Sequence, residues 1–188
     1  MENSETDDRQ LLEADEIRRL IERICEDVVE MVRAPERLAL VGIRTHGVTL
    51  ARRIQNILKD KHGWDVPMGI VDITLYRDDL GHRESQPIVR PTEIDFDIEG
   101  RVVVLVDDVI ATGRTIRCAL DEIISFGRPD AIRLTVLVDR GRREFPIQPD
   151  IVGEVVEADA DQRVEVRLDE EGQADAVWVA AAGSLSNS

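Results

Sequence analysis

The stretch VVVLVDDVIATGRT, Val102–Thr115, decides the fold. It opens with an aliphatic run that does not alternate with polar residues. Such runs are typical of a strand buried on both faces of a parallel sheet, so we predict a strand over residues 101–106. Two carboxylates, Asp107 and Asp108, follow the strand. A short loop of small and polar residues then leads into a helix predicted over residues 116–126.

Strands and helices alternate on both sides of this stretch. Aliphatic and β-branched runs predict further strands over residues 37–43, 66–75 and 131–138. Apolar residues at steps of three and four predict helices over residues 11–33 and 48–61. This order indicates an α/β fold, in which right-handed crossovers build an open parallel sheet flanked by helices.

The pattern changes in the C-terminal segment. Three short strand-like runs there predict a small antiparallel hood or edge, with strands over residues 151–156, 163–168 and 176–180. No linker divides the chain in two. We therefore expect a single domain over residues 11–180, between a frayed N-terminus (1–10) and a disordered tail (181–188).

Composition and charge exclude several classes of protein. The 188 residues include 24 Lys and Arg against 39 Asp and Glu, a net charge of −15, which repels nucleic acids and anionic membranes unless the cations cluster. No apolar run approaches the roughly 20 residues of a membrane span, and the acidic N-terminus does not resemble a signal peptide. Cys25 and Cys118 make neither a disulfide framework nor a zinc site. We expect a cytoplasmic protein.

The loop after the aspartates has the chemistry of a sugar-phosphate site. Ligands of open parallel sheets bind at the carboxyl ends of the strands. A helix start offers N–H groups and a positive dipole end that suit a phosphate, and Gly113 allows close approach of the backbone. Thr112 and Thr115 add hydroxyl donors. Asp107 and Asp108 are suited to accept hydrogen bonds from the vicinal hydroxyls of a ribose.

Alternative interpretations of these loops remain. Strand-end aspartates also cap helices or hold surface loops. The P-loop and dinucleotide-binding motifs do not fit, since no Lys-Ser/Thr follows a GxxxxG and no GxGxxG follows a strand. A second loop, GIRTHG (Gly42–Gly47), also joins a strand to a helix. Its N–H groups and Arg44 are suited to hold an anion, or it is an ordinary βα turn.

A hydrophobic strand, two acidic residues and a small-residue loop ending in TGxT resemble the signature of the type I phosphoribosyltransferases, which bind 5-phosphoribosyl 1-diphosphate (PRPP). Four motifs narrow the resemblance to the PyrR family, bifunctional pyrimidine operon regulators and uracil phosphoribosyltransferases. In chain order they are GIRTHG (42–47), DITLYRDDL (72–80), VDDVIATGRTIRCAL (106–120) and VLVDRGRREFPI (136–147).

The resemblance implies a set of site residues. Catalytic roles fall to Asp107, Asp108, Arg44 and Arg77. The residues implied to bind PRPP are Arg44, Thr45, Asp107, Asp108, Val109, Ile110, Ala111, Thr112, Gly113, Arg114 and Thr115. A lid would carry Arg77 and Arg83, and the base pocket would include Arg140 and Val155.

The implied reaction joins uracil to PRPP, giving UMP and pyrophosphate, with Mg²⁺ held mainly through PRPP and with no direct protein ligand assigned. The resemblance also implies a homodimer or homotetramer. Two other functions stay open. One is a UMP-sensing, RNA-binding attenuator of the pyrimidine operon with little enzymatic activity, and the other is a phosphoribosyltransferase for another base.

Leader RNA is the implied partner that this sequence disfavours. Arg143 occupies one basic position of the family's RNA-binding pattern. Gln148 and Glu154 stand where that pattern has Arg and Lys, and Glu22 and Glu26 stand where it has Thr and His. Because contacts to phosphate supply most of the affinity for RNA, we expect attenuation to be weak or absent.

Overall fold

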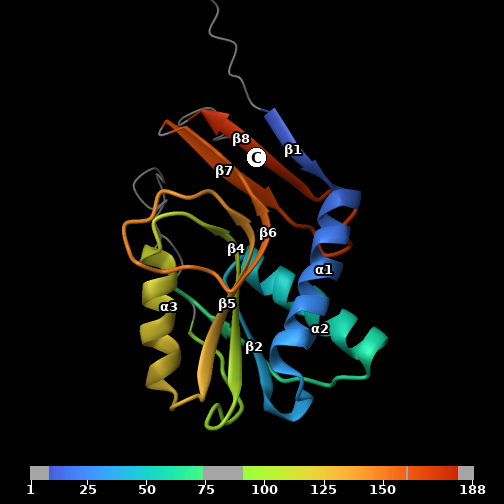
Figure 1. Ribbon diagram of the computed structural model, residues 1–188, viewed down its shortest axis with the longest axis vertical. Helices are drawn as coiled ribbons and strands as arrows, with labels where there is room; N and C mark the ends of the chain where they lie inside the picture. The colour runs from blue at the N-terminus through green and yellow to red at the C-terminus, as the bar shows by residue number, and fades with distance from the viewer. Residues whose placement is uncertain (1–8, 74–90, 160, 182–188) are drawn as a thin grey trace, which may run out of the picture.

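The computed structural model describes residues 9–73, 91–159 and 161–181, and a five-stranded parallel sheet forms its centre (Figure 1). The strand order is β3-β2-β4-β5-β6. Their bounds are β2 Leu38–Ile43, β3 Met68–Val71, β4 Val102–Ile110, β5 Ala131–Asp139 and β6 Ile151–Val155. Each pairs in parallel with its neighbour, as expected for strands joined by helical crossovers.

Helices cover both faces of this sheet. One face packs against α1 (Ala14–Val32) and α2 (His46–His62), and the other packs against α3 (Arg114–Ser125). A short 3₁₀ turn, η1 (Pro35–Arg37), leads from α1 into β2. The first half of strand β4, residues 102–106, is apolar because its side chains alternate between two cores. Val104 and Val106 join the α1–α2 core, and Val103 and Leu105 join the α3 core.

A second, smaller sheet forms the hood. It is antiparallel, with the order β1-β8-β7, and consists of β1 (Arg9–Glu13), β7 (Gln162–Arg167) and β8 (Ala176–Ala181). Figure 1 shows the hood beyond the carboxyl ends of the main strands, and β7 contacts β4. The hood therefore stands over the end of the sheet where a ligand is expected.

An ion pair between Arg53 of α2 and Asp175, just before β8, connects the hood to α2. Arg53 donates from both terminal nitrogens to the buried carboxylate of Asp175, at 2.9 Å for Nη2–Oδ1. Asp169, in the β7–β8 turn, accepts backbone hydrogen bonds that lower the pKa of its carboxyl, the strongest of them from Ala174. One arginine thus links the turn of the hood to the main core.

The structure corrects several element boundaries. Residues 9–13 form β1 rather than frayed chain and helix, because they pair with β8 along the hood. Strand β6 is the fifth parallel strand of the main sheet and not part of an antiparallel edge. Strand β4 continues through both aspartates to Ile110, so the loop before α3 is only residues 111–113.

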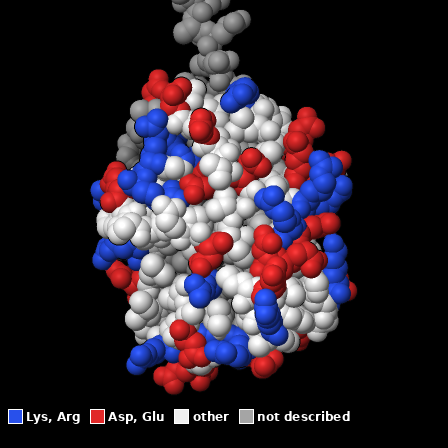
Figure 2. Space-filling model, in the orientation of Figure 1, with Lys and Arg blue, Asp and Glu red and all other residues white. Residues whose placement is uncertain are grey.

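Acidic and basic side chains alternate over the visible surface. Figure 2 shows basic side chains in groups broken by acidic ones over the face in view. In the described ranges, no helix combines the length and the apolar character needed to cross a membrane.

Cys25 is fully buried in the α1–α2 core, and this burial raises the pKa of its thiol to about 12. It packs as an inert apolar residue.

One buried hydroxyl yields a prediction. Thr135 on β5 is fully buried, lies between Val106 and Ile151 in the sheet, and its Oγ1 has no hydrogen-bond partner within the described structure. Thr135→Val keeps the side-chain shape and removes the unsatisfied hydroxyl. It should raise the free energy of unfolding by about 1 kcal/mol in urea denaturation.

Thr135→Ser is the matched control, because it keeps the hydroxyl and removes the methyl group. It should lower the free energy of unfolding by about 1 kcal/mol. A valine variant less stable than the wild type would show that the hydroxyl is satisfied in solution.

Candidate functional site

The strand order creates one topological switch point. From β2 the chain proceeds to β3 on one side, whereas β4 leads to β5 and β6 on the other. In such sheets the crevice between the two diverging strands is where ligands bind. The β2–α2 loop and the β4–α3 loop both lie at this crevice, and they carry the two motifs GIRTHG and DDVIATGRT.

Glycine allows the two loops to meet. A Cβ on Gly47, in the first turn of α2, would lie 2.5 Å from the carbonyl oxygen of Val106 and 3.1 Å from Cα of Asp107. A Cβ on Gly42 would lie 2.7 Å from Cα of Val48. Both glycines of the GIRTHG motif are therefore required for backbone to pack directly on backbone.

The paired carboxylates are buried at the end of β4. Asp107 is 3% exposed and Asp108 is 8% exposed. The backbone N–H of Asp108 donates to Oδ1 of Asp107 at 3.0 Å. Burial of two neighbouring carboxylates is costly unless they have partners, and this concentration of charge at a switch point is typical of a functional site.

Two acidic residues orient Arg44. Its Nε lies 3.6 Å from Oδ2 of Asp72, and its Nη2 lies 3.4 Å from Oε1 of Glu93. Its backbone N–H donates to Val71 at the end of β3. The neighbouring Thr45 is exposed at the N-cap of α2. The sequence identifies neither Asp72 nor Glu93 as a site residue. Asp72 opens the 72–80 motif without a distinguishing signal, and Glu93 is distant from Arg44 in the chain, so that only the fold brings the two together.

The β4–α3 loop has the geometry of a helix-start anion site. Gly113 occupies the N-cap of α3 with φ of +90°, a left-handed conformation that favours glycine. The hydroxyl of Thr112 accepts a hydrogen bond from the N–H of Arg114 at 3.2 Å. Thr115 lies in the first turn of α3, where backbone N–H groups have no partner within the helix.

Other members of the predicted loop set face elsewhere. Ile110 is 1% exposed and belongs to the α3 core, and Val109 is half-buried in β4. Any contact of Ile110 with a ligand would therefore be through its backbone. Arg114 pairs with Glu144, with Nε 2.7 Å from Oε2, and its guanidinium lies over the ring of Phe145.

The two residues predicted for a base pocket line one hollow. Arg140 and Val155 stand at the carboxyl ends of β5 and β6, and Gly141, Arg142 and the 156–159 segment complete the lining. Arg140 donates from Nη2 to the carbonyl of Gln162 at 3.1 Å, which ties β5 to the start of β7. Val155 is 67% exposed.

Arg77 and Arg83, the predicted lid arginines, lie outside the described residues. In the part of the chain that the structure describes, no three His, Cys, Asp or Glu side chains group as a metal-ligand cluster. The oxygen-rich pair Asp107–Asp108 nevertheless has the hard-donor chemistry that suits Mg²⁺ with a diphosphate.

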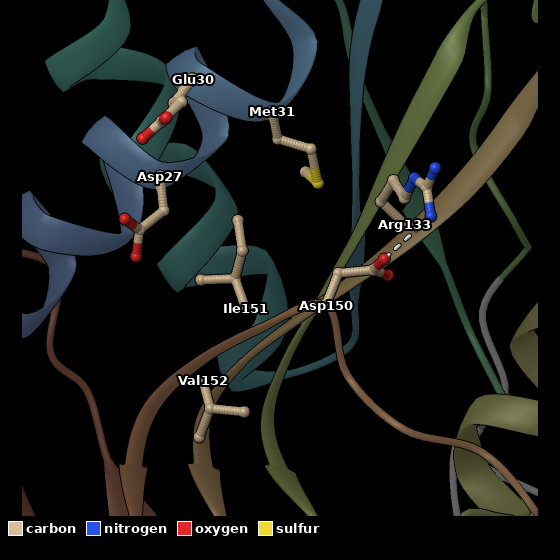
Figure 3. Close-up of a pocket in the computed structure, with 7 residues that line it drawn as sticks. All are labelled: Asp27, Glu30, Met31, Arg133, Asp150, Ile151 and Val152. Carbon is tan, nitrogen blue, oxygen red and sulfur yellow. Dashed lines mark hydrogen bonds and ion pairs between the residues drawn. The ribbon is translucent and has the colours of Figure 1, made fainter.

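A second hollow lies at the opposite end of the sheet. Figure 3 shows Asp27, Glu30 and Met31 of α1 facing the start of β6, where Arg133 pairs with Asp150 at 3.0 Å. Ile151 and Val152 complete its lining. It stands at the amino ends of β5 and β6, and none of the residues predicted for the site lines it. The candidate site is therefore the switch point.

Comparisons with known proteins agree with this geometry. The family model "Phosphoribosyl transferase domain" matches residues 8–170. The chain is 51% identical over 173 residues to the "Bifunctional protein PyrR" of Roseiflexus sp. (strain RS-1), covering 92% of this chain and 94% of the relative. It is 52% identical over 161 residues to the PyrR protein of Pelotomaculum thermopropionicum, covering 86% and 89%.

Solved structures share the fold at low identity. A hypoxanthine-guanine phosphoribosyltransferase from Bacillus anthracis aligns with a TM-score of 0.62 and 17% identity, covering 79% of this chain and 84% of that one. A hypoxanthine phosphoribosyl transferase from Trypanosoma cruzi gives 0.65 and 21%, covering 84% and 82%. Because about half of its residues are identical to those of these PyrR relatives over most of both chains, and the family model matches residues 8–170, the chain belongs to the PyrR family of phosphoribosyltransferases.

Proposed function

We propose that this protein transfers the phosphoribosyl group of PRPP to uracil, giving UMP and pyrophosphate. One observation carries the proposal. The buried pair Asp107–Asp108 ends a strand at the switch point, directly before a three-residue loop whose Gly113 opens a helix. The pair suits ribose hydroxyls, and the helix start that follows suits a 5′-phosphate.

The chemistry follows from these positions. Loss of pyrophosphate leaves positive, oxocarbenium-like character on the ribose ring. Asp107 and Asp108 accept hydrogen bonds from the ribose hydroxyls and supply negative potential beside the developing cation. Uracil then forms a bond to C1 through N1 and releases its N1 proton, for which the departing pyrophosphate and solvent water are the available acceptors. No covalent enzyme intermediate is needed, because positioning and electrostatics lower the barrier.

The proposed roles of Arg44 and the metal concern the leaving group. Arg44 and the N–H groups of its loop hold the departing pyrophosphate, with Asp72 and Glu93 orienting the guanidinium. Phosphoribosyltransferases generally use Mg²⁺ with PRPP. Bound with substrate, Mg²⁺ neutralises diphosphate charge, and Asp107 and Asp108 are the described carboxylates suited to hold its water shell.

The base and the lid complete the proposal. Uracil binds in the hollow beside Arg140 and Val155. Backbone groups of the 156–159 segment would recognise the polar edge of the base. Arg77 and Arg83 belong to a segment that closes over PRPP and excludes water. We propose a cytoplasmic homodimer or homotetramer as the working form.

A second function, regulation through leader RNA, is suggested by the printed name of the PyrR relatives, "Bifunctional protein". We propose that this chain has lost most of it. Glu22 pairs with Lys61 at 3.2 Å, and Glu26 lies 3.2 Å from Nε2 of His62, so two acidic side chains occupy the surface between α1 and α2. Arg143 is turned inward, 14% exposed, and pairs with Asp139.

Base specificity provides the first test. Uracil should stimulate the release of pyrophosphate from PRPP in the presence of Mg²⁺. Orotate and hypoxanthine should leave the rate at the level measured without a base. Release with hypoxanthine alone would instead identify a phosphoribosyltransferase for another base. No turnover with any base, together with UMP binding in calorimetry, would identify a nucleotide sensor.

Removal of either carboxylate provides the second test. Asp107→Asn and Asp108→Asn should each lower kcat/KM by about 100-fold or more, because each removes a charge that stabilises the cationic transition state. Thermal melting should remain near that of the wild type, since asparagine preserves the volume. Asp121→Asn, on the exposed face of α3, is the matched control and should leave the rate unchanged.

RNA binding provides the third test. A gel shift with the cognate leader transcript and UMP should show only weak, salt-sensitive binding. The double variant Gln148→Arg, Glu154→Lys should bind more tightly, because it replaces a neutral and an acidic side chain with cations. Tight, UMP-dependent binding by the wild type would refute the loss of attenuation.

A further inference from the structure

The segment Arg143–Ile147 wraps around the loop that precedes α3. We call this segment the clasp. It lies in the connection from β5 to β6, which Figure 1 shows running beside the start of α3. None of its residues belongs to the set that the sequence predicts to touch PRPP. Its contacts nevertheless concentrate on Ala111, Thr112, Gly113 and Arg114.

Arg143 makes the central contacts of the clasp. Its guanidinium donates to the carbonyl of Ala111 at 2.9 Å, to the carbonyl of Ile147 at 2.8 Å and to Oδ2 of Asp139 at 2.6 Å. The side chain is 14% exposed. A planar fork with several fixed donors can span these three acceptors at once, whereas a lysine ammonium cannot.

The backbone of the clasp binds the next residue of the loop. The N–H groups of Glu144 and Phe145 both donate to the carbonyl of Thr112, at 2.9 and 3.0 Å. A Cβ on Gly113 would lie 3.3 Å from Cβ of Phe145, so the ring-bearing residue packs against the glycine. Two successive loop carbonyls, those of Ala111 and Thr112, are thus held on the clasp side.

This arrangement fixes where the loop N–H groups point. In a planar trans peptide the C=O of one residue and the N–H of the next point in opposite directions. Holding the carbonyls of Ala111 and Thr112 toward the clasp therefore directs the N–H groups of Thr112 and Gly113 away from it. Oriented N–H groups at a helix start are the donors that an anion needs.

We infer that Arg143 is a positioning residue for the phosphate loop: it pre-orients the N–H groups that hold the 5′-phosphate of PRPP and UMP, and it contacts neither ligand. The inference rests on the proposed function for the identity of the ligand. The sequence places Arg143 in the RNA-binding pattern of the family, where it would contact phosphate directly. The inference gives the same side chain a role within the protein. The 5′-phosphate stays bound throughout the reaction, so loosening its donors weakens ground state and transition state alike.

Arg143→Lys and Arg143→Ala test the inference in the full-length protein, with Arg128→Ala as the matched control. Arg128 is exposed and lies between α3 and β5, at the far end of the sheet. The first readout is hydrogen exchange in the ligand-free protein. In both Arg143 variants the amides of Glu144 and Phe145 should exchange about tenfold faster or more, because their bonds to Thr112 open locally.

The second readout is kinetic. Both Arg143 variants should raise KM for PRPP about tenfold and keep kcat within about threefold, the signature of lost uniform binding. Exchange at Val104 and Leu105, in the centre of β4, should match that of the wild type. Arg128→Ala should change neither readout. The lysine variant should behave like the alanine variant, since the charge alone does not restore the fork.

Three outcomes would overturn the inference. One is wild-type exchange at Glu144 and Phe145 in Arg143→Lys. Another is a loss of kcat with KM unchanged, which would place Arg143 in the chemistry. The third is equally faster exchange in β4, which would show general destabilisation. Hydrogen exchange is measured without ligand. If the wild type failed to use uracil, the proposed function would be refuted, and the exchange measurement would still decide whether Arg143 orders the loop before α3.

Discussion

The close approach of α2 to β4 is the contact on which the site depends. Gly47 packs directly on the backbone of Val106 and Asp107, with no room for a side chain between them. This contact brings the β2–α2 loop, with Arg44, beside the aspartates of β4. A bulkier residue at position 47 would force the two loops apart. Under the proposed function, Arg44 and the aspartates would then no longer reach the leaving group and the ribose of one substrate together.

Much of this arrangement can be predicted from the sequence, because the strand pattern and the acidic residues of the site occur together in β4. Its unbroken aliphatic run predicts a strand between two cores, and the aspartates with Gly113 predict a ligand at its end. The pairing of β1 with β8 cannot be predicted from the sequence, since it joins residues near opposite ends of the chain. The same holds for Glu93 beside Arg44 and for the clasp around residues 111–114.

The boundary of β4 shows how tertiary context overrides local signals. Aspartate disfavours strands, so the sequence predicts that β4 ends at Val106. In the structure the ladder with β5 continues to Ile110, because β5 supplies partners up to Asp139. The aspartates are therefore held by a rigid strand and not by a flexible loop, which is the better support for a geometry-dependent reaction.

Under the proposed function, the distribution of charge would let an acidic protein favour a small, metal-bound anion over a long polyanion. Arg44 lies near Asp72 and Glu93, Arg114 pairs with Glu144, and Arg143 pairs with Asp139. Each of these cations at the site thus has a carboxylate beside it. Attraction for phosphate then comes largely from oriented N–H groups, the dipole of α3 and the metal that PRPP brings. These sources act over a few ångströms, and an extended nucleic acid would meet the net negative charge of the whole surface.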